Sequence, residues 1–138
     1  MPEARDRPCA GSNFLVDLGR GDPRAPSAGF AEVIFPAFDL EARAPAADAP
    51  SAPRLVLRRG VTGALDLCTW WNKARRGTAP QKRSVTVQLL ADDQTTVVRT
   101  WRFRNARPVS LSYTPLRAMD GAVAMETIEL AFDSVEMS

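Results

Sequence analysis

From residue 84 onward, the chain alternates apolar and polar residues in every segment that has a β-strand pattern. In the first segment the apolar positions are Val85, Val87 and Leu89. The polar positions of three of these segments are Ser84, Thr86, Gln88, Arg102, Arg104, Ser110 and Ser112. Successive side chains of a strand point to opposite faces, so each segment has one apolar and one polar face. Such strands predict a sheet that covers a core on one side and meets water on the other.

About seven strands are predicted in all. They cover residues 14–18, 30–42, 55–60, 84–90, 97–104, 109–113 and 127–133. Within 30–42 the alternation changes phase at Pro36, which predicts a bulge, because proline donates no hydrogen bond to a ladder. The Ala- and Pro-rich stretch 43–53 that follows predicts an exposed loop.

One helix is predicted between the third and fourth strands, from about residue 64 to residue 76. Its apolar stripe consists of Ala64, Leu67, Trp71 and Ala74, flanked by Cys68 and Trp70. Asp66 lies in the first turn, where the helix dipole favours a negative charge. Gly77 follows two arginines and is a typical C-cap residue. The segment therefore carries signals for both ends of a helix that packs on a sheet.

The fold class predicted from these elements is mainly β (α+β), an antiparallel β-barrel or sandwich of about seven strands flanked by one α-helix. Residues 1–12 are predicted as a flexible N-terminal arm and residues 13–138 as a single domain, which is long enough to bury a core. No run of 18 apolar residues exists, so no membrane anchor is expected. Cys9 and Cys68 are the only cysteines, which favours a reduced cytosol over a disulfide framework.

The residues that most enzymes rely on are missing from this chain. It has no histidine, which excludes Ser-His-Asp and Cys-His nucleophiles, HExxH metal sites and imidazole proton shuttles. Two cysteines alone cannot form a zinc site, and no phosphate-binding glycine loop occurs. The sequence therefore predicts a protein that is not an enzyme and has no catalytic residue, metal or cofactor.

Nucleic-acid binding is the alternative function from a different class. Arginines cluster around Trp101 and Phe103 at positions Arg99, Arg102, Arg104 and Arg107. Arginines beside exposed aromatic rings hold single-stranded nucleic acids. However, the alternation places both rings on the apolar face and Arg102 and Arg104 on the opposite one. This pattern favours core packing of the rings over a monomeric module that binds single strands.

Several segments, in order, resemble the tail-tube proteins of contractile phages and extracellular contractile injection systems. They are Gly29-Phe30-Ala31-Glu32-Val33; Leu57–Gly63 with Leu67, Trp70-Trp71-Asn72, Arg75 and Gly77; Val85–Leu90 followed by Trp101–Val109; and Val123–Ala131. Each motif alone is weak, but four in the family's order and approximate spacing are specific. The resemblance covers roughly residues 13–135.

This resemblance implies a structural protein that forms hexameric rings, which stack into a hollow inner tube inside a contractile sheath. Its partners would be itself and the sheath and baseplate proteins, with cargo or DNA in the lumen as open alternatives. The polar residues from Ser84 to Ser112 given above become candidate lumen residues, against the alternative that they face bulk solvent. Candidate sheath-facing residues are Asn72, Lys73, Arg75 and Arg76. The implied location is the bacterial cytoplasm during assembly and the contractile particle afterwards.

One segment departs from the family pattern. Family members usually carry a longer hairpin between the second and third strands, where this chain has the stretch 43–53, and a glycine is common where Pro36 stands. The candidate ring-stacking residues at this place are Arg43, Asp48 and Arg54. The departure leaves open a specialised ring, such as the tube initiator at the baseplate or the tube terminus. It also leaves open whether the particle is a phage tail or an injection system.

Overall fold

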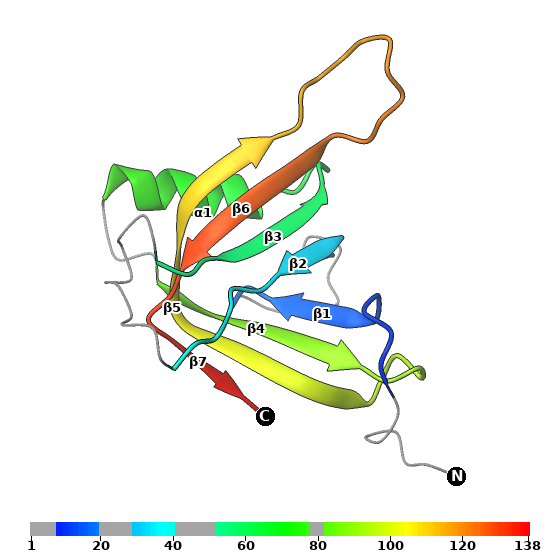
Figure 1. Cartoon of the computed structure of the whole chain (residues 1–138). Helices are drawn as coiled ribbons and strands as arrows, with labels where there is room; N and C mark the ends of the chain where they lie inside the picture. Colours follow the sequence, from blue (N-terminus) through cyan, green and yellow to red (C-terminus); the bar gives the residue numbers. More distant parts are fainter. Residues whose placement is uncertain (1–7, 20–28, 41–51, 78–81) are drawn as a thin grey trace.

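In the computed structural model, residues 8–19, 29–40, 52–77 and 82–138 are described. They form seven strands and one helix: β1 (Phe14–Asp17), β2 (Glu32–Ile34), β3 (Leu55–Gly60), α1 (Asp66–Arg76), β4 (Arg83–Leu90), β5 (Val97–Tyr113), β6 (Met125–Ala131) and β7 (Ser134–Met137). The sheet order is β1-β4-β5-β6-β3-β2, β7 pairs with β5, and all pairings are antiparallel. Figure 1 shows the sheet curving around its interior, with α1 at one side. The mainly β fold with one helix is confirmed.

β5 is long and bent, and it divides the sheet into two halves. Asn105 has a left-handed backbone with φ +55°. Its side chain donates to the carboxylate of Asp133 (2.9 Å), Arg107 donates to the same carboxylate (3.1 Å), and the Asp133 amide donates to the Arg104 carbonyl (3.0 Å). The residues of β5 up to Ala106 pair with β4 and β7, and those from Arg107 onward pair with β6. We call β1, β4, β7 and β5 up to residue 106 the first half-sheet, and β2, β3, β6 and β5 from residue 107 the second half-sheet.

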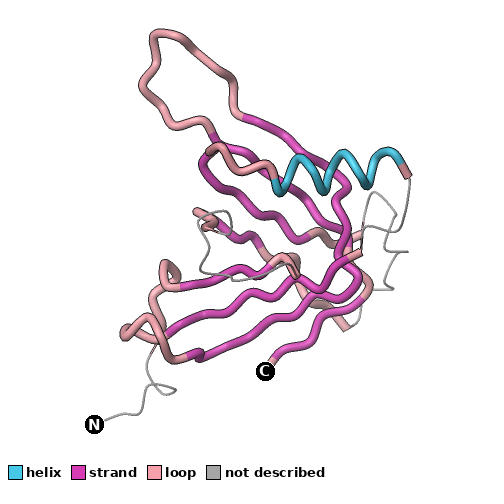
Figure 2. Tube along the Cα trace, turned by 180° about the vertical axis from the view of Figure 1, so that it is seen from behind, coloured by secondary structure: helices cyan, strands magenta, loops and turns pink. Residues whose placement is uncertain are grey.

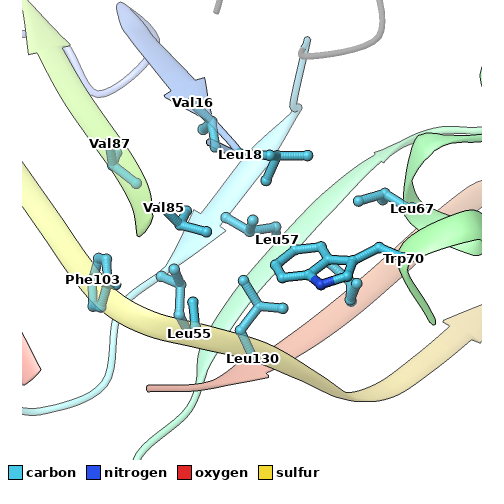
Figure 3. Packing of buried hydrophobic residues seen from close by; sticks show 12 residues of the cluster. Val16, Leu18, Leu55, Leu57, Leu67, Trp70, Val85, Val87, Phe103 and Leu130 are labelled. Atoms are coloured by element: carbon cyan, nitrogen blue, oxygen red, sulfur yellow. The ribbon is translucent and has the colours of Figure 1, made fainter. Parts of the chain in front are cut away.

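The hydrophobic core lies between the two half-sheets. Phe103, Val85 and Val87 of the first half-sheet belong to one cluster with Leu57 and Leu130 of the second, and all are at most 2% exposed. Figure 3 shows these side chains converging from both sides. Because the inner faces share this core, the polar outer faces of the two half-sheets point away from each other.

α1 closes one side of this core. Leu67 and Trp70 are fully buried, and the helix ends at Gly77, whose φ of +63° suits a glycine C-cap and whose amide donates to the Ala74 carbonyl. The predicted helix and its C-cap are therefore confirmed. The predicted stripe is wrong in two respects, because Trp70 rather than Trp71 is its buried tryptophan, and Ala64 lies before the start of α1 at Asp66.

Three strand predictions differ from the structure. The predicted strand 30–42 is only β2, which ends at Ile34, so the chain leaves the ladder before Pro36 instead of forming a bulge there. The segments 97–104 and 109–113 are one strand, β5, continuous through the bend. The last predicted strand ends at Ala131, and a further short strand, β7, was not predicted.

The bend should make part of the protein's stability depend on acid pH. Hydrogen bonds from Asn105 and Arg107 lower the pKa of Asp133 below its ordinary value of 3.8. The unfolded state then binds this proton more tightly, so the stabilisation is present above the unfolded pKa and is lost as the pH falls through the folded pKa. Asp133→Asn should therefore flatten the fall in unfolding free energy between about pH 4 and pH 2, measured by urea denaturation.

The matched control for this prediction is Asn105→Gly. Glycine adopts positive φ without strain, so this variant keeps the backbone of the bend and removes only the amide donor. It should flatten the same acid range, but less than Asp133→Asn, because Arg107 still holds the carboxylate. An Asp133→Asn variant with the wild-type acid profile would contradict this account of the bend.

Candidate functional site

The outer face of the first half-sheet carries a polar row across four strands. Cross-strand pairing aligns Asp17 of β1 with Thr86 of β4, Thr86 with Arg102 of β5, and Arg102 with Glu136 of β7. A second row pairs Gln88 with Thr100. These rows follow from the period-2 alternation, because their neighbours along each strand point into the core. Leu15 of β1 is the other neighbour of Gln88 in the second row, so the half-sheet presents a mainly polar surface with an apolar side chain at its β1 edge.

One bidentate ion pair fixes the β5–β7 edge of this surface. Both nitrogens of the Arg104 fork donate to the carboxylate of Glu136, at 2.8 and 3.0 Å. These hydrogen bonds, helped by the opposite charge, lower the pKa of Glu136 and raise the pKa of Arg104. Two arginines of the surface, Arg102 and Arg104, thus lie beside an acidic side chain that offsets part of their charge.

Ser84, another candidate lumen residue, is exposed at the irregularity in β4 between Arg83 and Val85.

The outer face of the second half-sheet is a separate polar surface. Ser112 pairs with Thr127 of β6, Thr127 with Arg58 of β3, and Arg58 with Glu32 of β2. Arg58 donates to the Thr127 hydroxyl at 3.2 Å and forms an ion pair with Glu32 at 3.3 Å. Ser110 pairs with Glu129 in the next row.

The structure thus divides the seven candidate lumen residues into two groups. Ser84, Thr86, Gln88, Arg102 and Arg104 lie on the first half-sheet, and Ser110 and Ser112 lie on the second. All are on strands whose apolar neighbours form the core. The bend at Asn105 separates the groups, so they form two surfaces rather than one. The sequence pattern contained no signal for this division, because the apolar residues of the predicted core face occupy odd-numbered positions in both 97–104 and 109–113.

A buried charged cluster fixes the turn that leads into α1. The side chain of Arg59 is 3% exposed and forms ion pairs with Glu126 of β6 (2.6 Å) and with Asp66 in the first turn of the helix. Burial opposes the charge of Arg59, but the hydrogen bonds to Asp66 and Glu126 outweigh it and leave its pKa raised. Burial and the nearby Glu126 carboxylate raise the pKa of Tyr113. The cluster ties β3, β6 and α1 together, and the sequence alone did not reveal it.

The candidate sheath-facing residues lie away from the buried side of α1. Lys73, Arg75 and Arg76 are exposed, and Arg75 donates to the Asn72 side chain at 2.9 Å. On the buried side, the Arg83 guanidinium lies over the Trp70 ring, 4.4 Å from its centroid. The outer side of the helix therefore presents a basic surface at its C-terminal end.

The candidate ring-stacking residues are only partly visible. Arg43 and Asp48 lie outside the described residues. Arg54 is half-buried immediately before β3, and its guanidinium donates to the carbonyl of Pro53 at 3.4 Å. Their role in stacking stays a prediction.

Phe103 and Trp101 of β5 pack in or against the core, as the alternation predicts. Phe103 is fully buried and makes an edge contact with Phe132 at 4.9 Å, and Trp101 packs against Phe35 at 4.7 Å. Arg102 and Arg104 point to the opposite face, so these rings and arginines do not form a joint platform for stacked bases. Within the described ranges, no three His, Cys, Asp or Glu side chains are placed to hold a metal ion. No helix of the described chain is long and apolar enough to cross a membrane.

Residues 47–136, well over half of the chain, match the T4-like virus tail tube protein gp19 family. The chain belongs to this family of structural tube proteins, and it is a tail tube subunit of a phage tail or of a contractile injection system. A search of curated proteins finds no significant match.

Solved structures agree with this assignment over nearly the whole chain. The chain is similar to a subunit of the PVC sheath–tube complex of an extracellular contractile injection system in the extended state, with 26% identity, TM-score 0.74, and coverage of 98% of this chain and 94% of that one. It is similar to a subunit of the PVC sheath/tube terminator, with 26% identity, TM-score 0.73, and coverage of 96% and 97%. A subunit of the tube-terminating cap of the anti-feeding prophage shares the fold at 24% identity and TM-score 0.74, with coverage of 96% and 91%. The predicted family is confirmed.

Proposed function

We propose that this chain forms hexameric rings that stack into the hollow inner tube of a contractile particle. The observation that carries the proposal is the likeness, over nearly the whole chain, to a subunit of a sheath–tube complex. The sheet also supports it: among the described elements, β1 pairs only with β4, and β2 pairs only with β3. Open edges of this kind invite pairing with another chain. A head-to-tail contact that closes on itself gives a ring.

One of the two polar outer faces is proposed to line the tube, because the two faces point away from each other. A subunit that encloses a wet lumen needs a sheet with its apolar side covered and its polar side open. Both half-sheets have this property, and Arg104 and Arg58 are each paired with a carboxylate. A wall built from such faces is hydrated and has its charges partly balanced. Cargo and DNA both remain as candidates for what the lumen holds.

The basic C-terminal end of α1 is proposed to contact the sheath, and the baseplate is proposed as the partner of the first ring. Lys73, Arg75 and Arg76 are exposed on one helix whose other side is anchored in the core. A rigid helix that presents several cations suits an acidic partner surface. Assembly would take place in the bacterial cytoplasm, and the tube would then remain within the particle.

A specialised ring is the second candidate function. The likeness to the sheath–tube subunit and to the terminator subunit is nearly equal, with TM-scores of 0.74 and 0.73 at the same identity. The short stretch 43–53 also departs from the family's longer hairpin. An initiator or terminal ring would keep the contacts around the ring and stack on one side only.

The decisive experiment is light scattering on the purified full chain, followed by negative-stain microscopy of the same fractions. Hexameric rings that stack into tubes are the expected result. Rings that do not stack would favour the initiator or terminal role. A monomer that binds single-stranded oligonucleotides in a strongly salt-dependent way would overturn the proposal.

The lumen assignment has its own test in cysteine accessibility. Ser84→Cys and Ser112→Cys each place a thiol on one polar face, in a chain whose Cys9 and Cys68 are replaced by serine. A polymer-linked maleimide too bulky to enter a tube should label both variants before assembly. In assembled tubes it should fail at Ser84→Cys or at Ser112→Cys, whichever lies on the lumen face, and a small maleimide should still react. Full labelling of both by the bulky reagent would contradict the lumen assignment.

A further inference from the structure

The loop between β5 and β6 carries exposed apolar side chains far from the core. Residues 114–124 project beyond the ends of the two strands in Figures 1 and 2. Leu116, Met119 and Val123 are 87%, 100% and 71% exposed. Most large apolar side chains of a domain this size are sheltered, so three in one projecting loop indicate a contact surface.

Internal hydrogen bonds hold this loop in shape. At its base, the Thr114 amide donates to the Met125 carbonyl (3.0 Å), and the Met125 amide donates to the Thr114 hydroxyl (2.9 Å). At its tip, the Asp120 amide donates to the Arg117 carbonyl, and the Asp120 carboxylate accepts from the Ala122 amide. A loop that is already ordered loses little conformational freedom when it binds.

The same molecule has an apolar groove elsewhere on its surface. It lies between the unpaired edges of β1 and β2 and has a volume of about 360 Å³. Its apolar lining comes from Phe14, Val33, Phe35, Leu89 and Trp101. We call it the β1–β2 groove. It exists because the ends of the sheet do not pair with each other, so core side chains stay accessible between them.

We propose that the 114–124 loop of one copy of this chain docks in the β1–β2 groove of a second copy. The inference rests on the proposed self-assembly and names the contact that carries part of it. The loop supplies apolar side chains, and the groove supplies an aromatic pocket that can cover them. Such a patch-and-pocket pair is a heterologous contact, which repeats from copy to copy and builds rings or stacks.

Charge complementarity supports a second copy as the occupant. Arg117, beside Leu116, forms no ion pair with any described residue. Glu32 lines the groove and pairs with Arg58 at 3.3 Å, but its side chain is still 49% exposed and can accept from a second arginine. The cation of the loop therefore meets an acidic group where the apolar side chains enter. An oppositely charged rim fixes orientation around a buried apolar centre.

The first test is a double substitution, Leu116→Asp with Met119→Asp. Both side chains are almost fully exposed, so the isolated chain should fold as before. Burial of each aliphatic side chain contributes roughly tenfold or more to association, so the variant should assemble at least about a hundredfold more weakly. The matched control is Leu116→Met with Met119→Leu, which keeps size and apolarity and should assemble like the wild type. Both are measured by light scattering over a concentration series.

The second test locates the contact by disulfide cross-linking between different chains. One chain carries Met119→Cys and the other Gly11→Cys, each with Cys9 and Cys68 replaced by serine. Gly11 lines the groove, and a Cβ there meets nothing within 4 Å, so the substitution is tolerated sterically. Mixed chains should give a disulfide-linked dimer under mild oxidation, and either chain alone should not give that species. Adding Leu116→Asp should abolish it.

The outcomes separate this inference from the proposed function. Wild-type rings or tubes, together with an unaffected double-aspartate variant and no cross-link, would overturn the loop–groove contact and leave the tube proposal standing. A weakened double-aspartate variant without the cross-link would mean that the loop binds somewhere other than the groove, which also overturns it. Wild-type chains that give neither assemblies nor the cross-link would overturn both.

Discussion

Trp70→Ala should lower the free energy of unfolding by about 3–5 kcal/mol, the range for removing a large aromatic side chain from a core. Trp70 is fully buried, and Figure 3 shows its ring between Leu67 of its own helix and Leu130 of the second half-sheet. Its removal leaves a large cavity where α1 meets the sheet. The Arg83 guanidinium also loses the ring that it covers. Urea denaturation followed by circular dichroism measures the loss.

Trp71→Ala is the matched control, because it removes the same side chain one residue along the same helix. Trp71 is only half-buried. Its loss should therefore be clearly smaller than that of Trp70→Ala, since less apolar surface returns to water. Equal losses in the two variants would show that the helix packs on the sheet with both rings. A larger loss for Trp71→Ala would contradict the orientation of α1.

This pair of tryptophans also shows which features of a helix the spacing of its apolar residues can predict. The stripe through Leu67, Trp71 and Ala74 has helical spacing, but a stripe through Leu67 and Trp70 is equally helical. A helix turns about 100° per residue, so adjacent large apolar residues leave its rotation open. The side chains of the sheet that pack against α1 decide which of the two tryptophans is buried. The helix itself and its end at Gly77 were predictable, because their signals are local.

Strands were predictable wherever the alternation was uninterrupted. β4 follows from Val85 and Val87, and β6 follows from Ile128 and Leu130, all of which are buried as expected. The bend in β5 was not predictable, because it depends on Asn105 adopting positive φ and on contacts with Asp133, 28 residues away. The sequence predicts two strands here because the alternation is interrupted between Asn105 and Pro108, and only the tertiary contacts of the bend join the two segments into one strand.

The candidate site was predictable only as a pattern on single strands. Thr86 and Arg102 were expected on polar faces, and cross-strand pairing places them side by side. The separation of these residues from Ser110 and Ser112 depends on the bend in β5, which the sequence did not predict. The projecting 114–124 loop could not be recognised, because a short stretch with Pro115 and Gly121 looks like any connection. Surfaces that act between copies leave no periodic signal in one chain.

Arg59→Met should cost about 3–5 kcal/mol of unfolding free energy, the usual cost of removing one partner of a buried ion pair. The side chains of Arg59 and Glu126 are 3% and 6% exposed, so methionine leaves the Glu126 carboxylate buried without its cation. The substitution also removes the ion pair with Asp66, which holds the first turn of α1 against β3. Arg59→Lys should recover only part of the loss, because a single ammonium cannot reproduce the planar fork that contacts both carboxylates.

The explanation is tested by adding Glu126→Leu to Arg59→Met. If the cost comes from an uncompensated buried charge, the double variant should regain most of the lost stability, because buried ion pairs are often replaced by apolar side chains without penalty. Asp66 is 32% exposed and can be solvated when its partner is gone. The matched control is Arg104→Met, which breaks an exposed pair with Glu136 and should change unfolding far less. A double variant as unstable as Arg59→Met alone would mean that Arg59 acts through its guanidinium over the Phe30 ring, whose centroid lies 5.4 Å from the guanidinium carbon, rather than through its pairing with Glu126.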